Sequence, residues 1–312
     1  MHSTTVKKIF LFLSMFIVVS LACDLSVTVV PSTSTAPVPT NTMIPAPETS
    51  TQIPASATSA PATLASNATS TALPPSFEGV SVFFRPLSLV LPLGLASGIS
   101  GNQFSRSEGD NVASWDVTPG HIQLKLEGYL LQGKSHQPQI LVYPATGYGE
   151  MYPGAFESIH RLTNILYNSG TSISDEQLPA VPFFNAQQVF TSNLQVISFQ
   201  NGRGVRFLTE YAQYAASANN HDLFYHFQGL TSDGAYIIAI LPITAPVLAE
   251  TSDGGAVLPP GGVPYFYFAD PKADMQGYYT AVTSLLNSTS PEAFAPTINQ
   301  LDLLIQSMRI TP

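Results

Sequence analysis

The sequence predicts an α+β domain in residues 77–312, an antiparallel meander sheet covered by helices, with a pair of helices at the C-terminal end. Short β-prone runs joined by tight turns fill residues 195–243, which is typical of antiparallel strands. Apolar residues at helical spacing follow after residue 270. Because strands and helices are grouped along the chain, the pattern favours α+β over alternating α/β.

The domain is expected to begin with strands. Residues 80–84 are β-prone, and residues 122–127 alternate between apolar and polar side chains, as in a strand with one wet face. The apolar run 139–143 follows after a turn at residues 133–136, so the two runs predict an antiparallel hairpin. Residues 96–101 are interpreted as a flexible loop.

One helix is expected to begin at Pro153, because proline suits the first helical turn. Its predicted apolar face consists of Phe156, Ile159, Leu162 and Ile165 or Leu166. Residues 168–170, which are Asn, Ser and Gly, are expected to end it.

The meander that follows is expected to contain four strands. They are predicted at residues 195–200, 205–211, 223–230 and 236–243. Asn201 and Gly202 tolerate positive φ and indicate a hairpin turn, and residues 232–234 indicate another. The last strand is apolar on both faces, so it should lie in the middle of the sheet and be covered on both sides.

Two helices are expected to end the domain. Asp270 and Pro271 indicate a cap and a first-turn proline for the first. Its apolar stripe is Met275, Tyr278 or Tyr279, Val282 and Leu285 or Leu286. In the second, helical spacing relates Phe294, Ile298, Leu301, Ile305 and Met308.

The stretch before these helices is expected to lack regular structure. The Gly- and Pro-rich residues 253–264 are interpreted as a long loop rather than a domain boundary, so residues 77–312 are expected to form one domain. The aromatic run 265–268 has two interpretations, the rim of a pocket or a buried strand.

Residues 1–22 have the organisation of a signal peptide. Lys7 and Lys8 precede an apolar run of about eleven residues, which is too short to span a membrane. Residues 20–22 then lead to Cys23, the only cysteine. The segment resembles a bacterial lipoprotein signal, which implies that Cys23 is lipidated and becomes the first mature residue. Residues 20–22 also suit cleavage after Ala22 without lipidation, so plain secretion is the alternative.

Residues 23–76 are predicted to be a disordered tether. Thr, Ser, Ala and Pro make up almost all of residues 31–75, with one charge, Glu48, and no aromatic side chain. Such a segment cannot bury enough apolar surface to offset the entropy of ordering it. At about 3 Å a residue, some fifty residues reach on the order of 150 Å when fully extended. A tether of this kind would hold a domain away from a membrane.

The charge balance excludes one class of partner. The chain has 11 Lys and Arg against 20 Asp and Glu, and loss of the signal peptide would remove Lys7 and Lys8 from the basic side. A net negative charge argues against binding nucleic acid. The expected partners are the membrane, through the lipid on Cys23, and an envelope protein or glycan.

No motif for catalysis, a cofactor or a metal is found. His221, Asp222 and His226 lie close in sequence, but two residues five apart on a strand point to opposite faces. The segment 98–102 lacks the final glycine of a nucleophile elbow. No cofactor is therefore expected.

One polar cluster is predicted on the meander. Arg206 and Glu210 share a face of one strand, and His226 and Gln228 share a face of the next. If the two faces coincide, these four side chains line a binding pocket. The alternative is a solvated sheet face with cross-strand charge pairs.

Three stretches, residues 200–207, 224–230 and 299–305, resemble uncharacterised bacterial lipoproteins with a Thr/Pro-rich tether and a hypothetical α+β domain. The element order is also similar to small domains of the PsbP and Mog1 type. Neither resemblance implies an activity. The sequence thus favours a surface-tethered, extracytoplasmic lipoprotein with a non-enzymatic binding or envelope-associated domain. The alternative is an extracytoplasmic enzyme that acts on cell-surface sugar or peptide.

Overall fold

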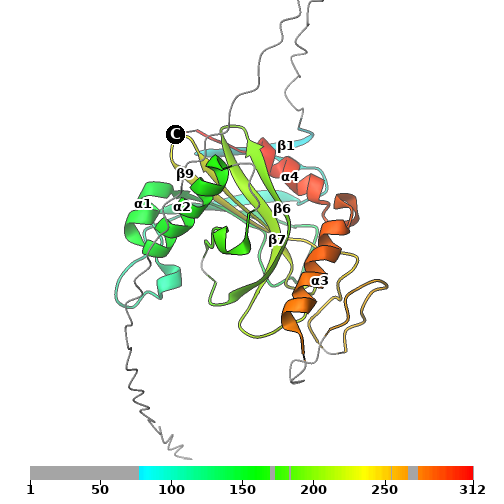
Figure 1. The fold of residues 1–312 in the computed structure, drawn as a ribbon. Helices are drawn as coiled ribbons and strands as arrows, with labels where there is room; N and C mark the ends of the chain where they lie inside the picture. Colours follow the sequence, from blue (N-terminus) through cyan, green and yellow to red (C-terminus); the bar gives the residue numbers. More distant parts are fainter. Residues whose placement is uncertain (1–76, 169–172, 183, 254, 266–272, 312) are drawn as a thin grey trace, which may run out of the picture. The chain divides into compact units, whose positions relative to one another are not determined.

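The computed structural model describes residues 77–168, 173–182, 184–253, 255–265 and 273–311 (Figure 1). A seven-stranded antiparallel sheet runs through this part of the chain in the order β3-β4-β5-β9-β8-β7-β6. Its strands are β3 (Gly98–Phe104), β4 (His121–Glu127), β5 (Gln139–Pro144), β6 (Gln187–Phe199), β7 (Gly202–Ala212), β8 (Phe224–Thr231) and β9 (Ala235–Pro242). The predicted signal peptide, Cys23 and the tether lie outside the described residues.

A second, three-stranded sheet joins the two ends of the described chain. It consists of β1 (Gly79–Phe84), β2 (Leu87–Pro92) and β10 (Arg309–Ile310), in the order β1-β2-β10. Ser88 of β2 pairs with Arg309 of β10.

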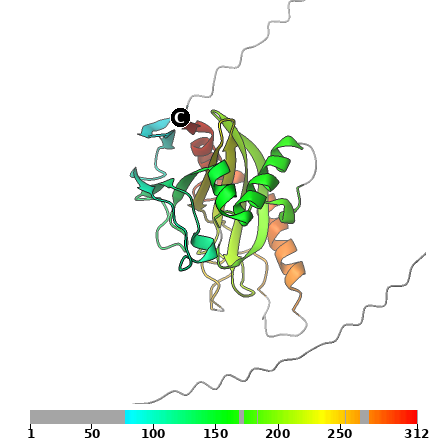
Figure 2. The same cartoon turned by 90° about the vertical axis from the view of Figure 1, so that its left-hand side faces the viewer.

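Helices cover both faces of the large sheet (Figures 1 and 2). On one face lie α1 (Ala145–Met151) and α2 (Pro153–Tyr167), and on the other lie α3 (Met275–Ser288), α4 (Ile298–Ser307) and the small sheet. The predicted α+β class, the antiparallel meander and the C-terminal pair of helices are confirmed. None of the helices in the described ranges is long and apolar enough to cross a membrane.

Strand β9 explains why the domain has two hydrophobic cores. Its residues Ile237, Ala239 and Leu241 pack towards α3 and α4, whereas Tyr236, Ile238 and Ile240 pack towards α1 and α2. All six are buried. The central, doubly covered position predicted for this strand is therefore confirmed.

The first long helix differs from its predicted face. Pro153 occupies its first turn and Leu162 and Ile165 are buried as expected. Phe156, however, is 60% exposed, because the buried stripe runs through Ala155 and Ser158 instead. The hydroxyl of Ser158 accepts a hydrogen bond from the Ala180 amide at 2.6 Å, so a polar residue replaces the expected apolar one.

The C-terminal helices bury the predicted stripes. In α3, Tyr278, Val282 and Leu286 are buried, and the Asp274 carboxylate caps the helix by accepting from the Gly277 amide at 2.8 Å. The predicted start at Asp270 lies outside the described residues. In α4, Thr297 caps the first turn. Phe294 and Met308 are buried but lie just beyond the ends of α4.

One region was predicted wrongly and several elements were missed. Residues 98–101 of the predicted loop 96–101 form a strand instead, since β3 begins at Gly98 and pairs along its whole length with β4. Its Gly and Asn residues have low strand propensity, so the strand depends on its neighbours, above all on pairing with β4. Also unrecognised were β2, α1, β10 and the first half of β6. Among the described residues of 253–264 there is no helix or strand, as predicted, and of the run 265–268 only Tyr265 is described.

Candidate functional site

Arg206 of β7 belongs to a buried clamp rather than to a pocket. Its Nε lies 3.2 Å from Oδ1 of Asp302 in α4, and its Nη2 donates to the side chain of Gln195 at 2.7 Å. A further guanidinium nitrogen donates to the carbonyl of Asn193. The hydroxyl of Tyr225 in β8 donates to the same Asp302 carboxylate at 2.7 Å. The clamp therefore joins α4 to three strands and occupies the donors of Arg206.

Glu210, four residues further along the same face of β7, is 2% exposed. Its Oε1 accepts from the backbone amide of Asn219 at 2.7 Å. Burial raises the pKa of Glu210 well above its ordinary value, the Asn219 hydrogen bond opposes the shift, and the charge of Asp222 adds to it. We therefore expect this carboxyl to hold its proton well above the ordinary range.

His226 and Gln228 lie on the opposite face of the sheet. The register pairs Phe207 with His226 and Val205 with Gln228, whereas Arg206 pairs with Phe227. The four predicted site residues are thus not brought together, and the predicted cross-strand pocket does not form. A shift of one residue in register moves every side chain of a strand to the opposite face of the sheet. The sequences of β7 and β8 alone do not decide which of the two registers forms.

His226 and Gln228 instead form part of the core beneath α2. The amide of Gln228 donates to the carbonyl of Pro179 at 3.0 Å and accepts from the hydroxyl of Tyr236. Burial, together with the nearby His136, lowers the pKa of His226 to about 3, although a hydrogen bond to the Val181 backbone opposes the shift. The solvated sheet face considered as the alternative is also wrong, because all four residues are buried.

A second polar cluster lies where the chain leaves β7 and enters β8. The hydroxyl of Ser135 donates to the carboxylate of Asp222, and Nδ1 of His221 lies 2.9 Å from the same carboxylate. The Asn219 amide donates to its other oxygen at 2.9 Å. Partial burial by itself raises the pKa of Asp222, but these three hydrogen bonds and the His221 charge outweigh it and lower the pKa.

This cluster is not arranged as a catalytic triad. In a triad the serine and the carboxylate bond to different nitrogens of the histidine. Here both Ser135 and Asp222 contact Nδ1 of His221, at 3.0 and 2.9 Å. The serine hydroxyl also donates directly to Asp222, so the histidine does not lie between the serine and the carboxylate as it does in a triad.

The same part of the molecule offers no metal site. Within the described ranges, no three His, Asp or Glu side chains are grouped so that they could hold a metal ion. His221 lies in a loop while His226 is enclosed in the core, as expected for two residues on opposite sides of a strand boundary.

An open polar area lies at the β3 edge of the large sheet. The helices of that face pack on β5, β7 and β8, and β4 presents Gln123, Lys125 and Glu127 beyond them. Neighbouring strands add more polar side chains in register. We call this area the open face, and it consists of Ser100, Asn102, Gln123, Lys125, Glu127 and Gln139. All six are half-buried or exposed.

Hydrogen bonds hold some of these side chains in place. The Gln123 amide donates to the Gln139 amide oxygen at 2.5 Å, and Ser100 donates to Glu127. Within the described residues, no carboxylate lies within ion-pair distance of Lys125. The centre of the open face therefore keeps an ammonium group that can bind a ligand.

Aromatic rings close one end of the open face. Phe104 stacks on His121 with ring centroids 5.2 Å apart and planes 11° apart, and His121 contacts Tyr143 at 4.7 Å. Phe104 is 43% exposed and Tyr143 is buried. Burial lowers the pKa of His121 although a hydrogen bond to the carbonyl of Pro119 opposes this, so the ring is neutral at neutral pH.

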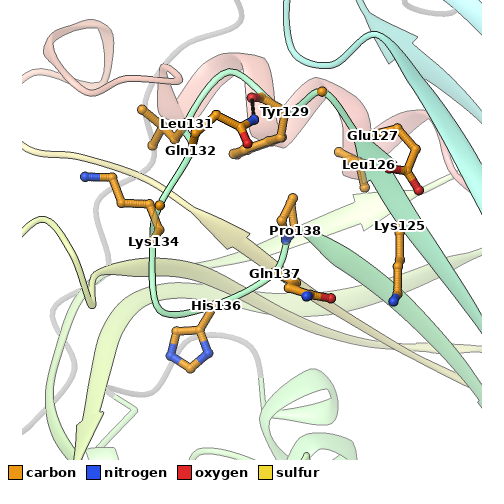
Figure 3. A pocket seen from close by; sticks show the side chains of 12 residues that line it. Lys125, Leu126, Glu127, Tyr129, Leu131, Gln132, Lys134, His136, Gln137 and Pro138 are labelled. Atoms are coloured by element: carbon orange, nitrogen blue, oxygen red, sulfur yellow. Dashed lines mark hydrogen bonds between the residues drawn. The ribbon is translucent and has the colours of Figure 1, made fainter.

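A pocket of about 380 Å³ lies at the other end. Lys125 and Glu127 line it from β4, and the loop 128–138 supplies the remaining wall (Figure 3). Two contacts fix this loop. The amide of Ser135 donates to the carbonyl of His221 at 3.0 Å, and Lys134 forms an ion pair with Glu250 at 2.5 Å.

The ring of His136 anchors the same loop in the protein. It contacts Phe224 at 4.3 Å and Phe184 at 5.3 Å between ring centroids. Burial lowers the pKa of His136 to about 4, so the ring is neutral at neutral pH. The pocket wall is therefore held by packing as well as by hydrogen bonds.

The open face was only partly visible in the sequence. The alternation of residues 122–127 predicted a wet face on β4, but the strand beside it was taken for a loop.

Comparison of the chain with family models, curated proteins and solved structures finds no match.

Proposed function

We propose that the protein is a surface-tethered, extracytoplasmic lipoprotein whose folded domain binds a component of the cell envelope without catalysis. The observation that carries the proposal is the division of the polar groups. Arg206, Glu210 and His226 are buried and serve the fold, whereas the open face and its pocket are accessible. The buried polar groups are used in holding the fold together, whereas the polar groups of the open face are accessible to a ligand, which suits binding.

The N-terminal sequence supports the anchored location. A short basic segment and an apolar run precede Cys23, and a Thr/Pro-rich stretch separates it from the domain. Two or more acyl chains hold a protein firmly on a membrane, whereas one does so weakly. An anchored domain on a long tether meets envelope partners at a raised effective concentration.

Replacement of Cys23 tests the anchor. In a bacterial host, we expect the full chain to fractionate with membranes and mass spectrometry to find an acylated Cys23 as the first residue. Cys23→Ala should abolish acylation and membrane retention, because no other cysteine is present. The nearby Ser26→Ala should behave like the parent chain. An unmodified Cys23 in the medium, or an intact residue 1, would refute the anchor.

An extracytoplasmic enzyme acting on cell-surface sugar or peptide is the second candidate. It is favoured by the partly exposed cluster of Ser135, His221 and Asp222, in which hydrogen bonds lower the pKa of the Asp222 carboxyl. It predicts hydrolysis of envelope glycan or peptide that Asp222→Asn abolishes and the exposed Asp116→Asn retains. Binding with no turnover in the parent chain would exclude it.

A further inference from the structure

We propose that the open face binds a glycan strand, with one sugar ring stacked on Phe104 and further sugars lying along β4 towards the pocket. This inference rests on the proposed binding function and names its ligand class. It is drawn from the juxtaposition of an exposed ring, a row of amides and a polar pocket.

The stacked end provides the apolar contact that a sugar ring needs. One side of Phe104 rests on His121 and the side chain is 43% exposed. Sugars present flat C–H surfaces, and an exposed aromatic ring that is supported from behind offers them a matching apolar surface. Because His121 backs the Phe104 ring and is itself held against Tyr143, little side-chain entropy is lost on binding.

The middle of the open face provides hydrogen bonds for hydroxyl groups. Register places Ser100, Lys125 and Gln139 in one cross-strand row and Asn102 beside Gln123 in the next. Amides carry both donors and acceptors, as sugar hydroxyls do. Fixed by the sheet, these groups lie at strand spacings of about 4.8 Å across and about 7 Å along the strands.

The pocket extends the same surface. From the Phe104 pair to the Glu127 row, β4 advances six residues, or about 20 Å. Lys125 and Glu127 belong both to the open face and to the pocket. A linear ligand of several sugar units therefore fits from the ring to the pocket without leaving polar contacts.

A protein partner fits this surface less well. The centres of protein interfaces are enriched in aromatic residues and Met and depleted in Lys and Glu. The residues of the open face are all polar, and the exposed apolar ring of Phe104 lies at its end. Nucleic acid is disfavoured because the chain has a formal net charge of −9.

Two neighbouring residues of β3 give a matched test. Asn102 and Gln103 are both exposed, but strand alternation places Asn102 on the open face and Gln103 on the other. The full chain, purified in detergent, is applied to an array of neutral and carboxylate-bearing envelope oligosaccharides, and bound ligands are titrated by calorimetry. Asn102→Ala and Phe104→Ala should each lower affinity about tenfold, and Gln103→Ala should leave it unchanged.

The outcomes separate this inference from the proposed function. Equal losses with Asn102→Ala and Gln103→Ala, or binding unaffected by both Asn102→Ala and Phe104→Ala, would overturn the glycan site. A blank array would overturn it too. If envelope retention of the non-acylated Cys23→Ala chain then still depended on Asn102, the binding function would hold and its ligand would not be a glycan. Thermal unfolding of each variant checks that the fold is kept.

Discussion

At the scale of the residue, buried charge was the most misleading signal. Arg206 and Glu210 read as members of an open polar cluster, because charged residues on a strand are most often exposed. The partner that buries Arg206 is Asp302, 96 residues later. No local pattern links the two. Strand alternation did show correctly that Arg206 and Glu210 share a face, but not which elements cover it.

Asp302→Asn tests the clamp. The change removes the charge that pairs with a guanidinium whose side chain is only 7% exposed. Breaking a buried pair from one side leaves the other charge uncompensated, so we expect a loss of about 3 kcal/mol in the free energy of unfolding. Urea denaturation measures it. Asp116→Asn, at an exposed position, should change it by less than about 0.5 kcal/mol. Equal effects would show that the clamp contributes nothing.

Glu210→Gln tests the buried carboxyl through pH. The folded protein holds the Glu210 proton more tightly than the unfolded chain does, since burial raises its pKa. The stability that this group contributes is therefore full below the ordinary Glu pKa and is lost as pH rises through the raised value.

As pH rises above the ordinary Glu pKa of about 4.3, we thus expect the parent chain to lose unfolding free energy relative to Glu210→Gln, by up to about 1.4 kcal/mol per pH unit. The Gln side chain can still accept from the Asn219 amide. Denaturant titrations at several pH values measure the difference. Parallel pH profiles for the two proteins would contradict a raised pKa.

At the scale of the element, strands whose own sequence has a β pattern were predictable. A strand that forms only because neighbouring elements pair with it or pack on it was not. The alternation in β4 and the apolar run in β9 are local. In contrast, β3 has few β-prone residues and exists because β4 pairs with it on one side and the β1–β2 hairpin packs on it. A Cβ at Gly101 would lie 2.5 Å from the ring of Phe84, which shows how closely that hairpin approaches.

Gly101→Ala tests this approach. The added methyl group must displace Phe84, so we expect a loss of about 1–3 kcal/mol in unfolding free energy. Gly98→Ala on the same strand is the control, since nothing lies within 4 Å of its Cβ position. It should be neutral or slightly stabilising, because alanine restricts the unfolded chain more than glycine does. A similar loss in both variants would mean that strand propensity, not packing on Phe84, decides the cost.

At the scale of the whole molecule, the class and layer order followed from local patterns, while the site did not. A meander with one doubly apolar strand requires cover on both faces, and helical stripes at residues 153–167 and after 270 provided it. The register between β7 and β8, by contrast, depends on the loop 213–223. Asn219 holds this loop through hydrogen bonds to Glu210 and Asp222. One such loop decides whether four polar residues meet or are separated by the sheet.

The small sheet can be completed only at the end of synthesis, because one of its strands lies near the C-terminal end of the chain. Arg309 pairs with Ser88, 221 residues earlier in the chain. The ribosome completes every strand of the large sheet before it makes β10, the second neighbour of β2. Completion of that sheet is thus a late step on or after the ribosome, and the newly made protein carries an unpaired strand edge until residues 309 and 310 have emerged.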